Sequence, residues 1–522
     1  MPAAPRGAGL PVRPETPSRR PLADLQAAVP GLRVRAEDAA TVVTGCTLDS
    51  RAVQAGDLYA ALPGARAHGA DFAAQAAAQG AAAVLTDPAG ADRVAATGLP
   101  VVLADDPRAL LGATAAALHG HPGRDLTVLG VTGTNGKTTT AFLLEAGLRA
   151  AGHTTGLLGT VLCRIGDTSF TSVRTTPEAP DLQGLLAVMR ERGVTAVALE
   201  VSSHALELGR VDGLVHDVAV FTNLSQDHLD FHPDMASYEA AKARLFTPAH
   251  SRRGVVNTDD DAGRRLAAAH RVPTTTYGAS GDWQARDVQL RPDGSSFRLV
   301  GPGVDVPASV QLPGAFNVAN AVGALAALVT AGVDVAAATA GVAGLTGVPG
   351  RMERVDAGQG FLAVVDYAHT PDAVRTLLQA VRAVTPGRVV VVLGCGGDRD
   401  RTKRPLMGRA AVEGADVAVL TSDNPRSEDP LQILREMAAQ APGAVVEADR
   451  RTAIAHAVAL ARPGDAVVVA GKGHETGQEA GGVVTPFDDR DVLRELLGQV
   501  PVTPVPVTQV PVTPVPVTQV PA

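Results

Sequence analysis

Short apolar runs alternate along this chain with longer segments in which apolar residues recur at helical spacing. Residues 125–131 form one such run, and residues 140–148 behind it place apolar side chains three and four positions apart. Further apolar runs at 196–199, 217–221 and 388–393 are each followed by polar loops and helical segments. Such repeated strand–helix alternation predicts an α/β fold built on doubly wound parallel sheets.

Breaks in this alternation predict three folded units between two terminal segments. Gly- and Pro-containing stretches at 119–124 and 346–351 separate the units. A length of 522 residues also favours two or three domains, because single hydrophobic cores stop growing well below that size. The expected division is a disordered Pro- and Arg-rich extension at 1–21, domains at 22–122, 123–350 and 351–498, and a disordered tail at 499–522.

The tail has a composition unlike the rest of the chain. Residues 501–510 repeat unchanged at 511–520, and the repeat combines Pro, Val and Thr without any charge. Proline removes backbone donors and favours an extended polyproline-like chain, so we expect disorder here. A docking peptide is the alternative.

Composition and charge exclude several classes of function. A net charge of −8 lacks the basic footprint of a nucleic-acid-binding protein, and aromatic residues make up only 3% of the chain. Cys46, Cys163 and Cys395 lie far apart, as in proteins kept in a reducing compartment. The N-terminal residues lack the apolar core of a secretory signal, and no apolar stretch is long enough to span a membrane. We therefore expect a cytoplasmic enzyme that is not embedded in a membrane.

The run Gly130-Val-Thr-Gly-Thr-Asn-Gly-Lys-Thr-Thr139 carries the strongest chemical signal. It lies between a predicted strand and a predicted helix, where backbone N–H groups and the helix N-terminus can surround phosphate oxygens. In that context Lys137 reaches the β- and γ-phosphates of ATP, and the Thr138 hydroxyl contacts Mg²⁺. Val131 stands where the usual phosphate-loop pattern has its first glycine, and a chance Gly/Thr-rich turn is the alternative.

Polar residues follow several predicted strands at the sheet edge where parallel sheets bind ligands. Glu200 follows the run 196–199, and His228 lies in the loop after 217–221. A carboxylate and an imidazole there suit Mg²⁺ beside a nucleotide, whereas hydrogen-bonded structural residues are the alternative. In the third unit Arg426 and Glu475 follow strands in the same way, which suits the two charges of an amino acid. Solvated loop charges are the alternative there.

Taken together, the motifs resemble the Mur ligases, the ATP-dependent amide-forming enzymes of peptidoglycan precursor synthesis. The similarity extends over about residues 22–497 and follows one order along the chain. It is greatest to the branch that adds the third residue of the stem peptide. The motifs that carry it are Thr47-Leu-Asp-Ser-Arg51, Gly133-Thr-Asn-Gly-Lys-Thr-Thr139, Thr175-Thr-Pro177, Glu200-Val-Ser-Ser-His204, Thr222-Asn-Leu-Ser-Gln-Asp-His-Leu-Asp230, Tyr238-Glu-Ala-Ala-Lys242, Gly314-Ala-Phe-Asn-Val-Ala-Asn320, Asp366-Tyr-Ala-His-Thr-Pro371, Gly397-Asp-Arg-Asp400, Asp423-Asn-Pro-Arg426 and Gly471-Lys-Gly-His-Glu475.

The resemblance implies a role for each motif and a three-domain architecture with a central phosphate-loop domain and a C-terminal Rossmann-like domain. The residues it implies for ATP are Gly133, Thr134, Asn135, Gly136, Lys137, Thr138, Thr139, Asn317, Asn320, Arg351 and Asp366. Those implied for the UDP-linked substrate are Leu48, Ser50, Ala65, Arg66, Ala67, Thr175, Thr176, Ser202 and Arg210, with Leu208 where the family commonly has glutamine. Those implied for the incoming amino acid are Arg399, Asp423, Asn424, Pro425, Arg426, Gly471 and Glu475.

For catalysis the resemblance implies Lys137, Lys242, His228 and Glu200, with Thr138, Glu200, His228 and a carbamylated Lys242 holding Mg²⁺. The carbamate would form from the neutral lysine amine and CO₂ and would turn a cation into a carboxylate. Without the resemblance, the helical composition of residues 237–244 makes Lys242 an ordinary helix-surface lysine.

The implied reaction joins an amino acid to UDP-N-acetylmuramoyl-L-alanyl-D-glutamate through an acyl phosphate, with ATP consumed. Asp423-Asn-Pro-Arg426 resembles the version that accepts meso-diaminopimelate, with Arg399 and Arg426 gripping its distal carboxylate. Ornithine and lysine are the alternative amino acids. A folylpolyglutamate synthase-like ligase and a phosphate-loop ATPase that regulates a partner are the alternative functions.

Overall fold

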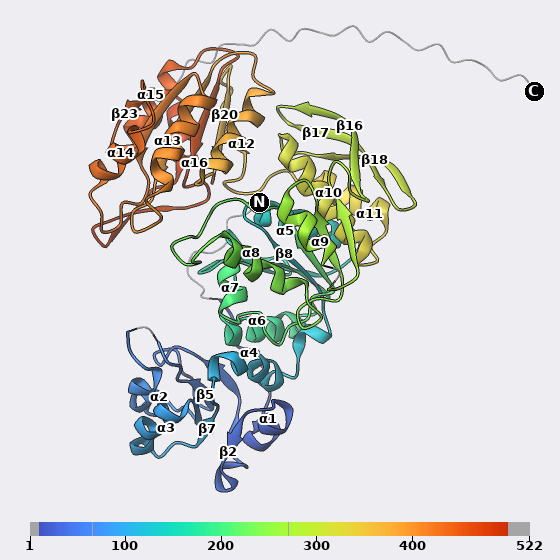
Figure 1. Cartoon of the computed structure of the whole chain (residues 1–522), viewed down its shortest axis with the longest axis vertical. Helices are drawn as coiled ribbons and strands as arrows, with labels where there is room; N and C mark the ends of the chain where they lie inside the picture. The colour runs from blue at the N-terminus through green and yellow to red at the C-terminus, as the bar shows by residue number, and fades with distance from the viewer. Residues whose placement is uncertain (1–9, 65, 270, 500–522) are drawn as a thin grey trace, which may run out of the picture.

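The computed structural model describes residues 10–64, 66–269 and 271–499. They form three α/β units that follow one another along the chain (Figure 1). The N-terminal unit lies at the bottom of the figure, the central unit in the middle and the C-terminal unit at the upper left. Each unit has its own mainly parallel sheet, which confirms the predicted fold class. The predicted disorder of the repeat tail concerns residues that, except for Gln499, lie outside the described ranges.

The N-terminal unit is a five-stranded sheet in the order β2-β7-β6-β5-β4, parallel except for β2. Its strands are β2 (Arg33–Val34), β4 (Gly45–Thr47), β5 (Asp57–Ala60), β6 (Ala83–Thr86) and β7 (Val101–Leu103). Its helices are α1 (Leu22–Ala28), α2 (Ala73–Ala78), α3 (Pro88–Val94) and α4 (Pro107–Leu118). Helices α3 and α4 are N-capped by Asp87 and Asp106, whose side chains accept from backbone N–H groups, and each helix has a proline in its first turn.

The segment predicted as a disordered extension is ordered from residue 10 onwards. Residues 20–21 form β1 (Arg20–Pro21), which pairs with β3 (Val42–Val43). Leu10 and Val12 pack against the core of the central unit. The prediction therefore fails for residues 10–21, because these contacts join the segment to residues far along the chain.

The central unit contains an eight-stranded sheet in the order β11-β10-β9-β12-β8-β13-β14-β15, in which the last six are parallel. Its strands are β8 (Thr127–Thr132), β9 (Thr155–Leu158), β10 (Leu162–Ile165), β11 (Thr168–Thr171), β12 (Ala196–Glu200), β13 (Val218–Phe221), β14 (Gly254–Asn257) and β15 (Thr274–Tyr277). Its helices are α5 (Lys137–Ala150), α6 (Ala179–Glu191), α7 (Ser203–Glu207), α8 (Met235–Ala243), α9 (Asp261–Ala268), α10 (Ala315–Thr330) and α11 (Val335–Gly344).

A three-stranded antiparallel sheet is inserted between β15 and α10. It comprises β16 (Gln284–Arg291), β17 (Gly294–Gly301) and β18 (Val304–Val310). The inner side of this sheet joins the same core as α5, α10 and α11. Trp283, the only tryptophan of the sequence, is buried in that core and forms a β-bridge with Tyr277. The insert thus braces the end of β15 beside α10.

The C-terminal unit is a six-stranded sheet in the order β19-β20-β24-β21-β22-β23, parallel except for β19. Its strands are β19 (Glu353–Arg354), β20 (Leu362–Asp366), β21 (Val389–Cys395), β22 (Val417–Ser422), β23 (Val445–Val446) and β24 (Ala466–Ala470), with a separate hairpin of β25 (Gly477–Ala480) and β26 (Val483–Pro486). Its helices are α12 (Pro371–Arg382), α13 (Lys403–Gly414), α14 (Pro430–Ala438), α15 (Arg450–Leu460) and α16 (Asp489–Leu497).

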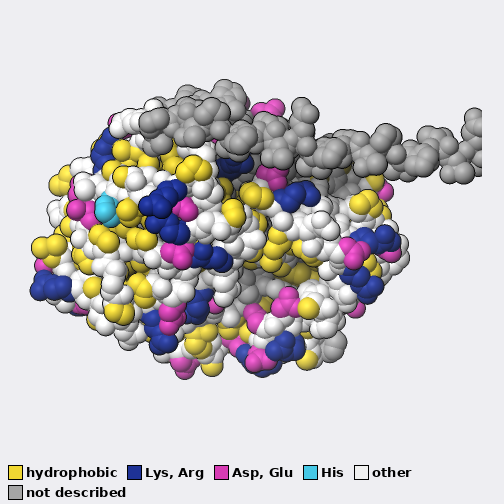
Figure 2. All heavy atoms as spheres, turned by 90° about the horizontal axis from the view of Figure 1, so that it is seen from above, with side chains coloured by type: hydrophobic (Ala, Val, Ile, Leu, Met, Phe, Trp, Pro, Cys, Tyr) yellow, Lys and Arg dark blue, Asp and Glu magenta, His cyan; other side chains and the backbone are white. Residues whose placement is uncertain are grey.

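Two further properties concern the charge on the surface and the hydrophobicity of the helices. Acidic and basic side chains are interspersed over the face seen from above the C-terminal and central units (Figure 2). Within the described ranges, no helix is long and apolar enough to cross a lipid bilayer.

Candidate active site

The phosphate-binding loop joins β8 to α5 and has the conformation that its glycines predict. Gly133 and Gly136 have φ angles of +147° and +87°, which side chains rarely adopt. A Cβ atom at Gly133 would overlap the Thr222 side chain, and one at Gly136 would overlap the Asn320 side chain. Both positions therefore require glycine, and the loop backbone can approach a ligand closely.

The loop is held from the neighbouring strand β13. The side-chain oxygen of Asn223 accepts from the Asn135 N–H at 2.9 Å, and the Thr222 hydroxyl donates to the Asn135 carbonyl at 2.6 Å. The Thr134 N–H donates to the Asn223 carbonyl at 2.8 Å. These bonds fix the loop before any ligand is present, which lowers the entropic cost of binding.

Two buried lysines converge on one carbonyl of this loop. The Nζ atoms of Lys137 and Lys242 donate to the Gly133 carbonyl at 2.9 and 2.7 Å, and Lys137 also donates to the Thr134 carbonyl at 2.8 Å. Burial lowers the pKa of both ammonium groups, and Lys137 lowers the pKa of Lys242 further. Both shifts favour the neutral amine over the ammonium, most of all at Lys242, whose pKa falls well below its usual value.

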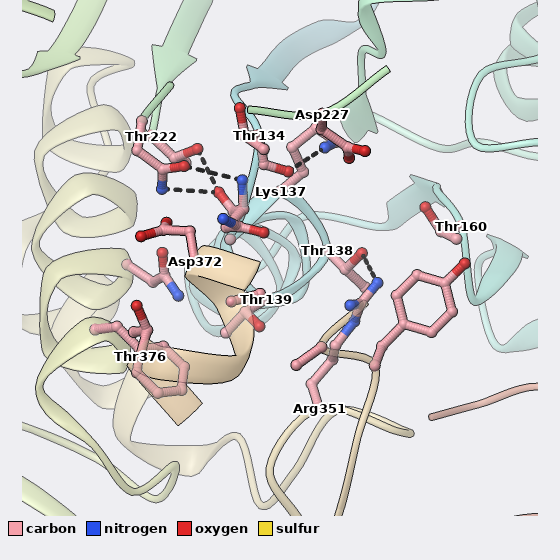
Figure 3. Close-up of a pocket in the computed structure, with 18 of the residues that line it drawn as sticks. Thr134, Lys137, Thr138, Thr139, Thr160, Thr222, Asp227, Arg351, Asp372 and Thr376 are labelled. Carbon is pink, nitrogen blue, oxygen red and sulfur yellow. Dashed lines mark hydrogen bonds between the residues drawn. The ribbon is translucent and has the colours of Figure 1, made fainter. Parts of the chain in front are cut away.

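Glu200, at the end of β12, is the main buried carboxylate of the site. Its Oε2 accepts from the hydroxyls of Thr138 and Thr160 at 3.0 Å each, and its Oε1 accepts from the Thr160 N–H at 2.8 Å. Nη2 of Arg351 donates to the Thr138 hydroxyl at 3.0 Å, as Figure 3 shows. The Nε of Arg351 is buried and lacks a hydrogen-bond partner among the described residues, so this guanidinium can bind another acceptor.

His228 lies close to Asp227, with 3.5 Å between Nε2 and Oδ2, and has a left-handed φ of +56°. Burial lowers the pKa of His228 to about 3, although Asp227 acts in the opposite direction. The imidazole is therefore neutral near pH 7 and has a nitrogen lone pair to offer. Unusual backbone conformations of this kind cluster at functional sites.

The donors around Thr138 fit a hard cation only in part. Across residues 10–64, 66–269 and 271–499, no three His, Cys, Asp or Glu side chains form a group that could hold a metal ion. The residues predicted to hold Mg²⁺ with these or hydroxyl groups are Glu200, His228 and Thr138, which all line the nucleotide cavity, as does the Asp227 carboxylate. Mg²⁺ usually takes one or two carboxylates together with substrate phosphates and water, so this set fits Mg²⁺ bound with a nucleotide.

A cavity of about 390 Å³ brings most of the residues implied for ATP together (Figure 3). The central unit supplies the phosphate loop and α10, and the segment from 351 to 377 supplies the opposite wall. Of the residues implied for ATP or catalysis, those lining it are Thr134, Asn135, Gly136, Lys137, Thr138, Thr139, Glu200, His228, Lys242, Asn317, Asn320, Arg351 and Asp366. Gly133 contributes its carbonyl through the lysine contacts described above.

Asn317, Asn320 and Asp366 lie in this cavity but already have partners. Nδ2 of Asn317 donates to the Pro313 carbonyl, and Nδ2 of Asn320 donates to the Asn317 side-chain oxygen. Both carboxylate oxygens of Asp366 accept backbone N–H groups, and burial raises the pKa of this carboxyl. A nucleotide would share these side chains with their present hydrogen-bond partners in the protein.

The residues implied for the UDP-linked substrate fall into two groups. Leu48, Ser50, Arg66 and Ala67 belong to the N-terminal unit, whereas Ala65 lies outside the described residues. In the central unit, Thr175 and Ser202 line the nucleotide cavity, whereas Thr176 and Arg210 do not.

A hydrogen bond of Thr176 and an ion pair of Arg210 explain why these two residues do not line the nucleotide cavity. Thr176 is fully buried, and its hydroxyl donates to the Glu200 carbonyl at 2.8 Å, so the side chain is committed to the backbone. Arg210 pairs with Glu178 at 2.8 Å.

The residues implied for the amino acid lie around three loops of the C-terminal unit. Asn424 donates to Glu475 at 2.7 Å, and the fully buried Lys472 donates to both side chains, at 3.1 and 2.9 Å. Arg426 has a left-handed φ of +54° and donates to the Gly397 carbonyl at 2.6 Å. Asn424, Arg426 and Glu475 line a second cavity, of about 1230 Å³, between the central and C-terminal units.

The other four residues of this set are not among those that line the cavity. Arg399 is exposed, although a Cβ atom added at Gly396 would lie 3.9 Å from its Cγ and 2.9 Å from Nη1 of Arg426. Asp423 and Pro425 flank Asn424 in the same loop, and a Cβ atom at Gly471 would lie 2.6 Å from Asp423 Oδ2. The structure therefore brings Arg426 to the cavity but leaves the Arg399 guanidinium outside it.

Sequence reasoning missed several residues that shape the site. Thr160 binds Glu200 through two hydrogen bonds, and applying the strand-end rule to β9 would have found it. Tyr367, whose ring lies 4.5 Å from the Arg351 guanidinium carbon, and Lys472 both fall inside motifs noted in the sequence. Their positions could not be assigned there because each depends on packing between separate loops.

Comparison with known proteins assigns the family. The family profiles described as "Mur ligase family, catalytic domain", "Mur ligase middle domain" and "Mur ligase, glutamate ligase domain" match residues 42–119, 131–328 and 350–473. The chain belongs to the Mur ligase family. It is therefore an ATP-dependent ligase that forms amide bonds, and a phosphate-loop regulator of a partner does not fit this membership.

Two curated relatives match almost end to end. A protein of Streptomyces avermitilis named UDP-N-acetylmuramoyl-L-alanyl-D-glutamate--2,6-diaminopimelate ligase is 60% identical over 94% of this chain and 98% of its own length. A protein of the same name from Corynebacterium glutamicum is 48% identical over 88% and 93%. A solved structure of a ligase with that name is 34% identical, with a TM-score of 0.66, and covers 92% of this chain and 99% of its own. This match confirms the three-domain architecture implied by the resemblance.

Proposed function

We propose that this ligase adds the third amino acid of the stem peptide, meso-diaminopimelate, to UDP-N-acetylmuramoyl-L-alanyl-D-glutamate in peptidoglycan synthesis. The near-complete matches to ligases named for this reaction support it. We also propose that the domains are 22–122, 123–350 and 351–498, each of which contains one of the mainly parallel sheets of eight, six or five strands.

The observation that carries this proposal is the bond network from Arg351 through the Thr138 hydroxyl to Glu200. It joins the start of the C-terminal unit to the phosphate loop across the nucleotide cavity. A nucleotide bound there would contact both units at once, and the neighbouring second cavity would hold the amino acid. Such an arrangement would hold two reactants side by side, and proximity of this kind can remove a large part of the reaction barrier.

In the proposed reaction the D-glutamyl side-chain carboxylate attacks the γ-phosphate of ATP, and ADP leaves. Lys137 and the Nε of Arg351, which has no hydrogen-bond partner among the described residues, would offset charge on the phosphates, while the loop would orient them. The amine of the amino acid then attacks the acyl phosphate and loses a proton, and phosphate leaves.

Thr138, Glu200 and His228 would hold Mg²⁺ together with phosphate oxygens. When bound, Mg²⁺ would neutralise charge on the transferring phosphate. We further propose that Lys242 carries an Nζ-carbamate. Its lowered pKa favours the neutral amine that reacts with CO₂, and the negative charge of a carbamate would be attracted to the Lys137 ammonium.

The amino acid is assigned through Arg426. Its guanidinium lines the second cavity and can pair with the distal carboxylate of diaminopimelate, which ornithine and lysine lack. Lys472, Asn424 and Glu475 would define the other end of the pocket. L-Ornithine and L-lysine remain the alternative substrates.

Phosphate release tests the proposal. The purified protein should release phosphate from ATP only when both the UDP-linked dipeptide and an amino acid are present, and the product should gain the mass of that amino acid. Phosphate release with ATP alone at the same rate would contradict the ligase assignment. Preference for ornithine or lysine would overturn only the choice of amino acid.

A further inference from the structure

Residues 10–16 cross the junction between the N-terminal and central units, and we call them the N-terminal strap. Leu10 and Val12 pack on the central unit beside Leu158 and Leu185. Further along the strap, two successive backbone N–H groups donate to the Glu191 carboxylate of α6 at 2.8 Å each. The strap is thereby fixed to the central unit at two points.

Between these points Arg13 reaches the N-terminal unit. Its Nη2 lies 2.5 Å from Oδ2 of Asp57, and its Nη1 donates to the Cys46 carbonyl at 3.1 Å. The Asp57 side chain is only 2% exposed, so this ion pair is shielded from water on the Asp57 side. Arg13 therefore ties the first residue of β5 and the middle residue of β4 to the strap.

Two glycines make room for the strap. A Cβ atom at Gly184, in the interior of α6, would overlap the Val12 carbonyl. One at Gly45, in β4, would overlap the Arg13 guanidinium. Glycine inside a helix costs about 1 kcal/mol relative to alanine, so Gly184 needs a packing reason, and the close approach of the strap supplies it.

The strand that Arg13 holds leads directly into the loop implied for the UDP end of the substrate. β4 ends at Thr47, and Leu48 and Ser50 follow. Helix α6 packs against β4, and both α4 and α6 lie at the junction of the two units (Figure 1). The strap thus completes an interface between α6 and the strand that carries this loop.

We propose that Arg13 is a positioning residue, which holds β4 and the loop after it against the central unit so that the UDP end of the substrate can bind. This inference rests on the proposed function for the identity of that substrate. Among the described residues, Arg13 is not one of those lining the nucleotide or the amino-acid cavity, so its effect should be confined to the UDP-linked substrate.

Steady-state kinetics on Arg13→Ala and Gly184→Ala tests the proposal. Loss of a charge-assisted hydrogen bond weakens an interaction by roughly tenfold or more in its equilibrium constant. Arg13→Ala should therefore raise KM for the UDP-linked dipeptide by about that factor, with kcat and the KM for ATP nearly unchanged. Gly184→Ala should act in the same direction because it displaces the strap, yet it should not weaken the helix. Arg13→Lys should recover part of the loss.

Matched controls separate positioning from general damage. Arg33→Ala removes an exposed pair with Asp105 in the same unit, and Gly344→Ala adds a methyl group at a helix end with nothing within 4 Å. Both should behave as wild type. If Arg13→Ala and Gly184→Ala change the KM for the UDP-linked dipeptide no more than these controls do, the proposal is wrong.

Amide hydrogen exchange gives a readout that needs no substrate. Arg13→Ala should speed exchange in residues 45–51, and Arg33→Ala should not. Unchanged exchange there would overturn the positioning role even if wild-type enzyme proved to use a different substrate. Inactivity of the wild-type protein toward the UDP-linked dipeptide, with faster exchange in Arg13→Ala, would instead refute the proposed function alone.

Discussion

The Nζ atom of Lys242 lies 2.7 Å from the carbonyl oxygen of Gly133 and donates a hydrogen bond to it. This contact joins α8 to the phosphate loop across 109 residues of sequence. Nζ also lies 4.4 Å from the centre of the Tyr238 ring. A carbamate would keep one N–H for the carbonyl while presenting a carboxylate to the cavity.

Lys242→Ala should lose activity and regain part of it when a short carboxylate such as formate is added, because the added anion can occupy the place of the carbamate. The measurement is phosphate release with and without formate, with Lys403→Ala tested in parallel for non-specific rescue. Intact-mass or crystallographic data showing an unmodified Lys242 in fully active, Mg²⁺-loaded enzyme would exclude the carbamate.

Lys137→Ala should abolish phosphate release while the fold stays intact. Among the described residues, its Nζ donates to two loop carbonyls, so its loss should affect bound phosphates more than the fold. Circular dichroism and thermal unfolding check the fold, and coupled phosphate detection checks the activity. Turnover like that of the wild type would disprove the ATP site.

Arg426→Ala should lower kcat/KM for diaminopimelate. The loss should correspond to about 2–5 kcal/mol of transition-state free energy, the usual loss for one partner of a buried charge pair. Lysine and ornithine, which lack the distal carboxylate, should be affected much less. The measurement is kcat/KM for all three amino acids in both proteins, at saturating ATP and UDP-linked dipeptide. An equal loss for all three would mean that the arginine shapes its loop and does not select the substrate.

Arg450 and Asp489 form an ion pair in which both side chains are fully buried, with 2.7 Å between Nε and Oδ1. Arg450→Met should lower the free energy of unfolding of the C-terminal unit by roughly 3–5 kcal/mol, because Asp489 would remain buried without its partner. The double variant Arg450→Met/Asp489→Leu should recover most of this loss. Urea unfolding measures both, and a loss below about 1 kcal/mol in the single variant would contradict the argument.

The fold class could be predicted because the strand–helix alternation is a local pattern, and the phosphate loop because its glycines, lysine and threonine are adjacent in sequence. Lys242 shows where such reasoning ends. Its neighbours have the composition of an exposed helix, yet the side chain is 1% exposed because the phosphate loop covers it. The prediction of disorder was wrong for residues 10–21 because their partners also lie far away in the sequence. Arg13, for example, donates to Asp57, 44 positions away.

Thr176 and Arg399 show that the direction of a side chain could not be predicted from the sequence. A motif identifies the residue type but not the direction of its side chain, and Thr176 is directed toward the backbone at Glu200. The Arg399 guanidinium is exposed, although its stem lies near Arg426. Such orientations depend on hydrogen bonds between separate loops, which composition and spacing do not specify.

The single tryptophan has a practical consequence for measuring nucleotide binding. Trp283 is buried and bridges to Tyr277, and Tyr277 lines the nucleotide cavity. The indole fluorescence of this protein therefore comes from a residue that is bridged to Tyr277, which lines the nucleotide cavity. A shift in emission during a titration with ATP would report nucleotide binding in this cavity, without a label and without turnover.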